Sequence, residues 1–300
     1  MGKNLVISLA TNYSYYLLDP FVRSLDDSGF DGDFVLFYDN LSGRTLRKLR
    51  ERGVILKKFD SEGFKKKGLH IMHYRFMMYY EFLKKSFKKY DNILIADVRD
   101  VFFQKDPFVY ENYGPLNLFA EELTLEECSI NSHIFELSSS AKELKKYSKE
   151  NILCAGTTIG TTKGIMDYLK KMTLKLNIKD ILFDQGYHNY LFYAGKLPGA
   201  KKFHNLKGPV LTLAEMGSKN LKYNNKRQVI NLDGSVVNIL HQYDRDLGLL
   251  YRSNKFGYFL LSLSRSLKIK IRRGIKISLF RLPLLGRYFR KKYYDPTRFK

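Results

Sequence analysis

Short apolar runs alternate with segments of helical period through the first hundred positions of the chain. The apolar runs predict four strands, at residues 4–10, 33–39, 54–59 and 93–96. The spacing of apolar side chains between them predicts helices over residues 17–28, 45–52 and 69–87. Strands that alternate with helices favour an α/β fold with a mostly parallel sheet flanked by helices.

The pattern is less regular after residue 110. A strand is expected over residues 116–120, ending at Glu121 and Glu122, and helices over residues 141–149, 164–176 and 178–193. Two further apolar runs, 228–232 and 236–240, flank Asp233-Gly234, which is typical of a hairpin turn. We place a domain boundary near Tyr251, which gives a domain of residues 1–250 and a tail of residues 251–300.

The net charge of +22 is concentrated in that tail. Residues 251–300 hold fifteen lysines and arginines against one acidic residue, whereas the first 250 residues hold 37 basic and 29 acidic ones. Within residues 256–293, apolar and basic side chains alternate, and Gly274 and Pro283 divide them into pieces too short to span a bilayer. Such a segment is typical of a peptide in the headgroup layer of an anionic membrane. The alternative is a basic helix packed on the domain.

The remaining composition is that of a globular chain. A hydrophobic content of 44% supports a core rather than disorder. Cys128 and Cys154 form neither a disulfide framework nor a metal-binding spacing, and we assign neither thiol a role. The opening residues, MGKNLVISLA, contain too short an apolar run for a signal peptide. We therefore expect a cytoplasmic protein that associates peripherally with a membrane.

The strongest candidate chemistry lies in residues 90–108, YDNILIADVRDVFFQKDPF. A predicted buried strand ends there in Asp97 and Asp100, with Arg99 between them, and unpaired charges at such a place are costly. Carboxylates at the carboxyl end of a strand suit Mg²⁺ or Mn²⁺. Because residues three apart on a straight strand face opposite ways, both carboxylates reach one cation only if the chain turns at Val98-Arg99. The alternative is a salt bridge of Arg99.

Polar residues follow other predicted strands as well. Thr11, Asn12 and Tyr13 form a polar turn after the first strand, and Asp39 ends the second. His241 follows the apolar run 236–240 and opens the sequence HQYDR. Taken alone, a histidine at the end of a strand is more typical of a structural hydrogen bond than of a metal ligand.

Three further segments carry candidate residues. Arg75 lies on the predicted helix before the acidic strand, and the alternative is a surface arginine. Gly156 lies in LCAGTTIG, where glycine lets a ligand approach the backbone, although glycines also mark plain turns. Asp184, Gln185 and Asn189 lie on one predicted helix, and the alternative for Asp184 is a helix cap.

In this order, the motifs resemble those of GT-A glycosyltransferases, which use nucleotide-sugar donors, and in particular the retaining family-8-like enzymes. The resemblance covers about residues 4–245 and implies a GT-A (Rossmann-like) fold. One departure is the spacing Asp-x-x-Asp at positions 97 and 100, where the family usually has Asp-x-Asp.

The resemblance implies a role for each group of candidates. The implied ligands of Mn²⁺ or Mg²⁺ are Asp97, Asp100 and His241. The implied donor-binding residues are Thr11, Asn12, Tyr13, Asp39, Arg75 and Gly156. Asp184 and Gln185 are the catalytic candidates, and Glu121 and Glu122 are further candidate bases if the reaction inverts the sugar.

We therefore expect a glycosyltransferase, of hexosyltransferase type, that moves a sugar from a nucleotide-diphosphate donor to a glycan or glycolipid acceptor at a membrane surface. UDP is expected by family frequency, and the family-8 likeness favours retention. One alternative is a nucleic-acid-binding protein that uses the basic tail, although the tail is rich in large aliphatics and no nucleic-acid motif is present. The other alternative is a non-catalytic scaffold at a membrane surface, which the acids and the histidine disfavour.

Overall fold

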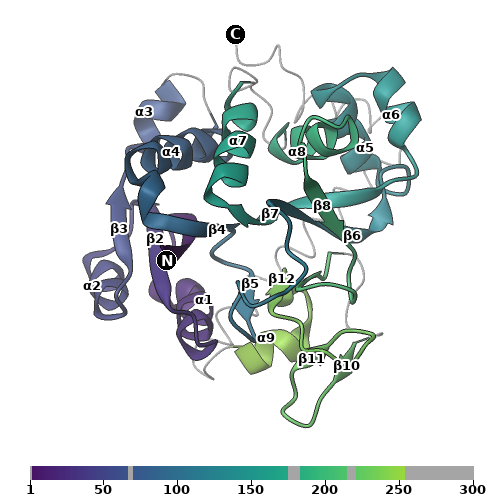
Figure 1. Ribbon diagram of the computed structural model, residues 1–300. Helices are drawn as coiled ribbons and strands as arrows, with labels where there is room; N and C mark the ends of the chain where they lie inside the picture. Colours follow the sequence, from purple (N-terminus) through teal and green to yellow (C-terminus); the bar gives the residue numbers. More distant parts are fainter. Residues whose placement is uncertain (1, 67–69, 175–182, 215–220, 254–300) are drawn as a thin grey trace.

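The computed structural model describes residues 2–66, 70–174, 183–214 and 221–253. Its centre is a seven-stranded sheet in the order β3-β2-β1-β4-β7-β6-β8 (Figure 1). These strands are β1 (Lys3–Thr11), β2 (Gly32–Asp39), β3 (Ile55–Lys58), β4 (Tyr90–Ala96), β6 (Leu116–Thr124), β7 (Asn151–Thr161) and β8 (Ala200–Phe203). Every neighbouring pair is parallel except the two pairs that include β7. The prediction of a mostly parallel α/β sheet is confirmed.

Helices cover both faces of this sheet (Figure 1). On one face lie α1 (Tyr15–Asp27) and α2 (Gly43–Glu51), and on the other α4 (Ile71–Ser86), α7 (Thr162–Thr173) and α8 (Phe183–Tyr193). The alternation along β1 explains the two layers, because Leu5 and Ile7 pack in the core with α4 and α7, whereas Val6 packs in the core with α1. The helices α5 (Ser129–Ser138) and α6 (Ala141–Tyr147) flank α8, and α3 (Ser61–Lys66) precedes α4.

A second, three-stranded sheet lies beneath the main one, on the side of α1 (Figure 1). Its order is β5-β12-β9, from β5 (Val101–Phe103), β12 (Ile239–His241) and β9 (Val210–Thr212). Phe103 of β5 packs edge-on against Phe21 of α1, with ring centroids 4.9 Å apart. The remaining elements here are β10 (Lys222–Tyr223), β11 (Val229–Ile230), the 3₁₀ turn η2 (Tyr243–Arg245) and α9 (Leu247–Ser253). This small sheet brings the end of the described chain back to the end of β4.

The predicted elements of the first hundred residues are confirmed, whereas β6, α5 and the turn at Asp233-Gly234 differ from the prediction. The strand β6 does not end at Glu121 and Glu122 but continues to Thr124. The helix α5, with the sequence SINSHIFELS, was not predicted.

The Asp233-Gly234 turn forms, but it does not join two paired strands. Gly234 has a φ of +86°, and the Asn231 N–H donates to Ser235 O at 2.8 Å. Beyond one bridge between Ile230 and Val236, however, the two sides separate. The strand β11 pairs with β10, and β12 pairs with β5 and β9. Long-range pairing therefore overrides the local hairpin signal.

The predicted domain boundary near Tyr251 falls within α9. The predicted amphipathic segment 256–293 lies outside the described residues. Among the described residues, no helix is both long enough and apolar enough to cross a membrane.

Candidate metal and donor site

Asp97, Asp100 and His241 meet at the edge of the main sheet where β4 ends. Each offers one ligand atom, and these atoms lie within 4.8 Å of one another. After Ala96 the chain leaves β4 and bends through residues 97–100, as a shared site for both carboxylates requires. The strand β12 supplies the histidine, because His241 is the register partner of Val101 on β5. Contacts between distant segments thus bring together the three predicted metal ligands.

Two arginines hold the carboxylates of Asp97 and Asp100. Each arginine binds one carboxylate oxygen, and the other oxygen of that carboxylate lies on the side of the cluster. Arg75 Nη1 donates to Asp97 Oδ1 at 2.6 Å, and Arg99 Nη2 donates to Asp100 Oδ2 at 2.6 Å. Asp97 Oδ2 then faces Gly156, and Asp100 Oδ1 lies 4.0 Å from His241 Nε2. Arg99 also pairs with Asp244, at 2.7 Å. The salt bridge of Arg99 therefore forms beside the cluster. The predicted cation site and its alternative, a salt bridge of Arg99, do not exclude each other.

The imidazole of His241 is 1% exposed. Its Nδ1 lies 3.6 Å from Cys154 Sγ, whereas Nε2 has no hydrogen-bond partner among the described residues. Burial lowers the pKa of His241, against the opposing effect of the Asp100 and Asp97 charges. Burial raises the pKa of Asp100, but Arg99 and then His241 outweigh it and hold that pKa below its usual value. A neutral imidazole and an ionised carboxylate are the forms that bind metals.

Gly156 on β7 forms one wall of this cluster. A Cβ at position 156 would lie 2.5 Å from His241 Nε2 and 2.9 Å from Asp97 Oδ2. The Asp97 N–H donates to Gly156 O at 2.8 Å, which fixes the strand against the bend. Two carboxylate oxygens, an imidazole nitrogen that no described residue pairs with, and a wall that tolerates no side chain fit a divalent cation such as Mn²⁺ or Mg²⁺.

Arg75 is a buried bridge rather than a surface arginine. It is 5% exposed, and its Nη2 donates to Asp184 Oδ2 at 3.0 Å while Nη1 holds Asp97. Burial opposes the charge of Arg75, but Asp97 and Asp184 raise the pKa of the guanidinium above its usual value. Arg75 therefore joins a predicted metal ligand to a predicted catalytic residue, across the space between β4 and α8.

The first turn of α8 presents Asp184 and Gln185 to the same region. Asp184 Oδ1 accepts a hydrogen bond from its neighbour, Gln185 N, at 2.9 Å. One turn later, the side chain of Asn189 bonds both the N–H and the C=O of Leu153 on β7, each at 2.7 Å. Asn189 thus fastens α8 to the strand that contains Gly156. Two residues of this region were not anticipated from the sequence: Cys154, next to His241, and Asn131, next to Gln185.

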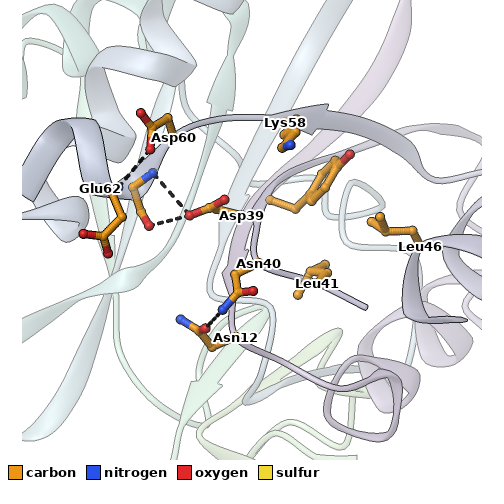
Figure 2. A pocket seen from close by; sticks show the side chains of 10 residues that line it. Asn12, Asp39, Asn40, Leu41, Leu46, Lys58, Asp60 and Glu62 are labelled. Carbon is orange, nitrogen blue, oxygen red and sulfur yellow. Dashed lines mark hydrogen bonds between the residues drawn. The ribbon is translucent and has the colours of Figure 1, made fainter. Parts of the chain in front are cut away.

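The predicted nucleotide-binding residues Asn12 and Asp39 line a pocket of about 540 Å³ (Figure 2). Asn40 Nδ2 donates to Asn12 Oδ1, and both asparagines have a positive φ. Asp39 Oδ2 accepts hydrogen bonds from the N–H and the hydroxyl of Ser61 at the start of α3. The other residues that line the pocket are Tyr38, Leu41, Leu46, Lys58, Asp60 and Glu62.

This pocket and the cluster share one edge of the sheet. The parallel strands β2, β1 and β4 are neighbours, and they end at Asp39, Thr11 and Ala96. Thr11 is the register partner of Asp39. Tyr13 lies near Arg99, because its charge, after those of Asp100 and Asp244, contributes to raising the pKa of the Arg99 guanidinium.

The two glutamates proposed as alternative bases differ in their environment. Glu121 is buried on β6, and Glu122 is exposed. Glu121 also raises the pKa of the Cys154 thiol, although burial is the larger cause. Of the two, Glu121 is therefore the one on the side of the cluster.

No protein-family model matches the chain, and no curated protein matches it in sequence. Among solved structures, the chain is similar to the galactosyltransferase LgtC in complex with donor and acceptor sugar analogs, with a TM-score of 0.47, 13% identity, and coverage of 79% of this chain and 86% of that one. An active-site mutant of LgtC gives a TM-score of 0.46 at 13% identity, with the same coverage of 79% and 86%.

The bifunctional glycosyltransferase WbbM, in its apo structure, gives a TM-score of 0.47 at 15% identity. That match covers 80% of this chain and 45% of WbbM. All three neighbours are glycosyltransferases, but at these scores the likeness assigns no activity to the chain.

Proposed function

We propose that the chain is a metal-dependent glycosyltransferase that moves a hexose from a nucleotide-diphosphate donor, a UDP-sugar, to a glycan or glycolipid acceptor. One observation carries the proposal: Asp97, Asp100 and His241 converge at the edge where the parallel strands end, and the buried Nε2 of His241 has no partner among the described residues. Ligand sites of α/β sheets lie at this edge.

Asp97, Asp100 and His241 would hold a divalent cation, which would supply Lewis-acid stabilisation of the negative charge that develops on the leaving diphosphate. The residues of the chain prepare the site for it. Arg75 and Arg99 each take one oxygen of a carboxylate, so the two carboxylates are oriented before the donor binds. Orientation of this kind lowers the cost of assembling the reacting groups.

The nucleoside of the donor is proposed to occupy the pocket lined by Asn12 and Asp39. These residues offer a side-chain amide and a carboxylate, and Leu41 and Leu46 offer apolar surface for a base. Asp39 accepts a ribose hydroxyl in this arrangement, and Thr11 and Tyr13 complete the turn beside it. The shared edge of the sheet supports a donor that extends from this pocket to the cluster.

The transferred sugar is proposed to lie between the cluster and the first turn of α8. Gln185 and Asp184 are the catalytic candidates there, and Arg75 ties Asp184 to the metal ligand Asp97. The resemblance of the sequence motifs to those of family-8 enzymes favours retention of the configuration. Glu121 is the alternative base for an inverting reaction, because it is the buried member of the pair of glutamates.

The acceptor is proposed to be reached at the cytoplasmic face of an anionic membrane, which the tail binds through residues 256–293. This part of the proposal depends on the sequence, in which the last fifty residues have a net charge of +14. Each basic residue near an anionic surface contributes about 1 kcal/mol of attraction. A lipid-linked acceptor would be concentrated at the same surface.

Release of sugar from a panel of nucleotide sugars tests the proposed function. The full chain is incubated with UDP-, GDP-, TDP- and CMP-sugars, first with EDTA and then with Mn²⁺ in excess, and free sugar and nucleotide are measured. We expect turnover of a UDP-sugar that EDTA abolishes and Mn²⁺ restores. No turnover of any donor with Mn²⁺ would contradict the proposal. Tight binding of RNA or DNA under the same conditions would then favour the nucleic-acid alternative.

A further inference from the structure

A line of side-chain contacts runs from the start of α5 to the metal cluster. Asn131 Nδ2 donates to Cys128 Sγ at 3.2 Å, and Asn131 Oδ1 accepts a hydrogen bond from Gln185 Nε2 at 2.7 Å. On the far side of Gln185, its Oε1 lies 4.0 Å from Cys154 Sγ. Cys154 in turn lies 3.6 Å from His241 Nδ1. The line therefore joins α5, α8, β7 and β12.

The oxygen end of the Gln185 carboxamide faces the side of the metal cluster, and the amino end faces Asn131. A carboxamide has one donor end and one acceptor end, so each contact that fixes one end also fixes the other. The amino group of Asn131 is directed to Cys128, and its oxygen accepts the hydrogen bond from Gln185 Nε2. With its amino group on Asn131, Gln185 has its oxygen on the opposite side, where Cys154 and His241 lie.

The oxygen of Gln185 is left available by this arrangement. Within the described ranges, its one polar contact is the long one from Cys154 Sγ. An oxygen held on the side of the metal cluster can accept a hydrogen bond from a sugar hydroxyl or approach a sugar carbon that becomes electron-poor. If the carboxamide turned over, an amino group would occupy the same place and repel a developing positive charge.

We propose that Asn131 is a positioning residue that holds the Gln185 carboxamide with Oε1 directed to the transferred sugar. The inference rests on the proposed function, because it takes Gln185 to contact the sugar. The terminal torsion of glutamine is broad and roughly two-fold, so its orientation must be imposed by a neighbour. Asn131 is that neighbour, and it acts on the reaction through Gln185 alone.

Two matched substitutions of Asn131 test the inference by kinetics. Asn131→Leu has a similar size and removes the acceptor, whereas Asn131→Asp keeps an acceptor oxygen for Gln185 Nε2. For Asn131→Leu we expect kcat to fall about tenfold with KM for the donor unchanged, since a small misplacement of a reacting group is costly. We expect Asn131→Asp to recover most of kcat. A rise in KM for the donor with kcat unchanged, or no change in either constant, overturns the inference.

A double-mutant cycle separates positioning from a general structural effect. In the Gln185→Ala background, we expect Asn131→Leu to cause no further loss of kcat, because the group that it positions is absent. An equal loss in both backgrounds overturns the inference, since Asn131 would then act independently of Gln185.

A spectroscopic measurement tests whether Asn131 orients Gln185, and it needs no turnover of a nucleotide sugar. The side-chain NH₂ resonances of Gln185 are identified in ¹⁵N spectra by their loss in Gln185→Ala. We expect Asn131→Leu to shift them and to speed their exchange with water, and Asn131→Asp to keep them protected. Unchanged Gln185 resonances in Asn131→Leu overturn the inference. An inactive wild-type chain with shifted resonances contradicts the proposed function, but it supports the hydrogen bond by which Asn131 orients Gln185.

Discussion

Gly156 lies so close to His241 that a Cβ at position 156 would be 2.5 Å from the imidazole Nε2. The same Cβ would lie 2.9 Å from Asp97 Oδ2. Real Cβ atoms do not approach other atoms to 2.5 Å, so the smallest side chain must displace the histidine or the strand. The backbone of β7 therefore forms a wall of the proposed metal site, and glycine is required there for space.

Gly156→Ala is expected to weaken Mn²⁺ binding at least about tenfold, as loss of a group that orients the metal ligands typically does. Titration with Mn²⁺, followed by electron paramagnetic resonance of the free ion, measures this. Gly43→Ala is the matched control, because a Cβ at position 43 meets nothing within 4 Å. If Gly156→Ala bound Mn²⁺ as tightly as Gly43→Ala, the wall would have no role in the site.

Arg75→Lys is expected to lower the free energy of unfolding by about 3 kcal/mol, because breaking a buried ion-pair network leaves charges uncompensated. A lysine ammonium is a compact charge and cannot bridge Asp97 and Asp184 in the fork geometry of a guanidinium. Denaturant unfolding measures the loss. Arg47→Lys is the control, since its pair with Glu51 is exposed and such pairs contribute under about 1 kcal/mol. Equal stability of the two variants would show that the bridge is not stabilising.

Acid is expected to destabilise the fold through His188, which is fully buried beside Tyr168. Burial, assisted by Arg75, lowers the pKa of His188 to about 3. The unfolded chain takes up a proton below the ordinary pKa of 6.5, whereas the folded chain does not, so stability is lost as the pH falls from 6.5 towards 3. The loss from this group is about 1.4 kcal/mol per pH unit, or about 2 kcal/mol at pH 5.

Denaturant unfolding of the wild type and of His188→Asn, each at pH 7.5 and pH 5, checks this prediction. Asparagine offers Tyr168 a hydrogen-bond partner but does not titrate. Other histidines titrate equally in both proteins, so the difference between them isolates His188. The variant is expected to lose less stability on acidification. An identical loss in both proteins would contradict the assignment.

The sequence was sufficient to predict the elements of the first hundred residues, because strands and helices there differ clearly in apolar period. It also predicted the condition for a shared metal site, a turn at Val98-Arg99, and the structure has that turn. The grouping of His241 with Asp97 and Asp100 was inferred from motif order, not from any property of the histidine.

The rest could not be predicted because it depends on contacts between distant positions. Arg75 bonds residues 22 and 109 positions away, and Gln185 bonds Asn131 from a helix that the pattern did not indicate. The pairing of β12 with β5 and β9, which brings His241 to the cluster, competes with a strong local hairpin signal. Local patterns predict elements, but the partners of their side chains follow from the tertiary fold.

A chain truncated after Ser253 is expected to lose binding to anionic vesicles and to keep donor hydrolysis. The cut preserves α9, whose Leu249 and Leu250 are buried in the core. Sedimentation with phosphatidylglycerol-containing vesicles measures binding, and high salt is expected to weaken that of the full chain, since the attraction is electrostatic. Equal vesicle binding by the full and truncated chains would contradict the role proposed for residues 256–293.

The most direct test of the central claim is the stoichiometry of Mn²⁺ binding in the wild type and in Asp100→Asn. Asparagine keeps the shape of the side chain and an oxygen for Arg99, so the fold is expected to persist, which a melting curve in EDTA verifies. Asp167→Asn, at an exposed acid on α7, is the control. We predict one Mn²⁺ per chain in the wild type and the control, and at least about tenfold weaker binding in Asp100→Asn. Equal affinity and stoichiometry in all three proteins would contradict the assignment of Asp97, Asp100 and His241 as a metal site.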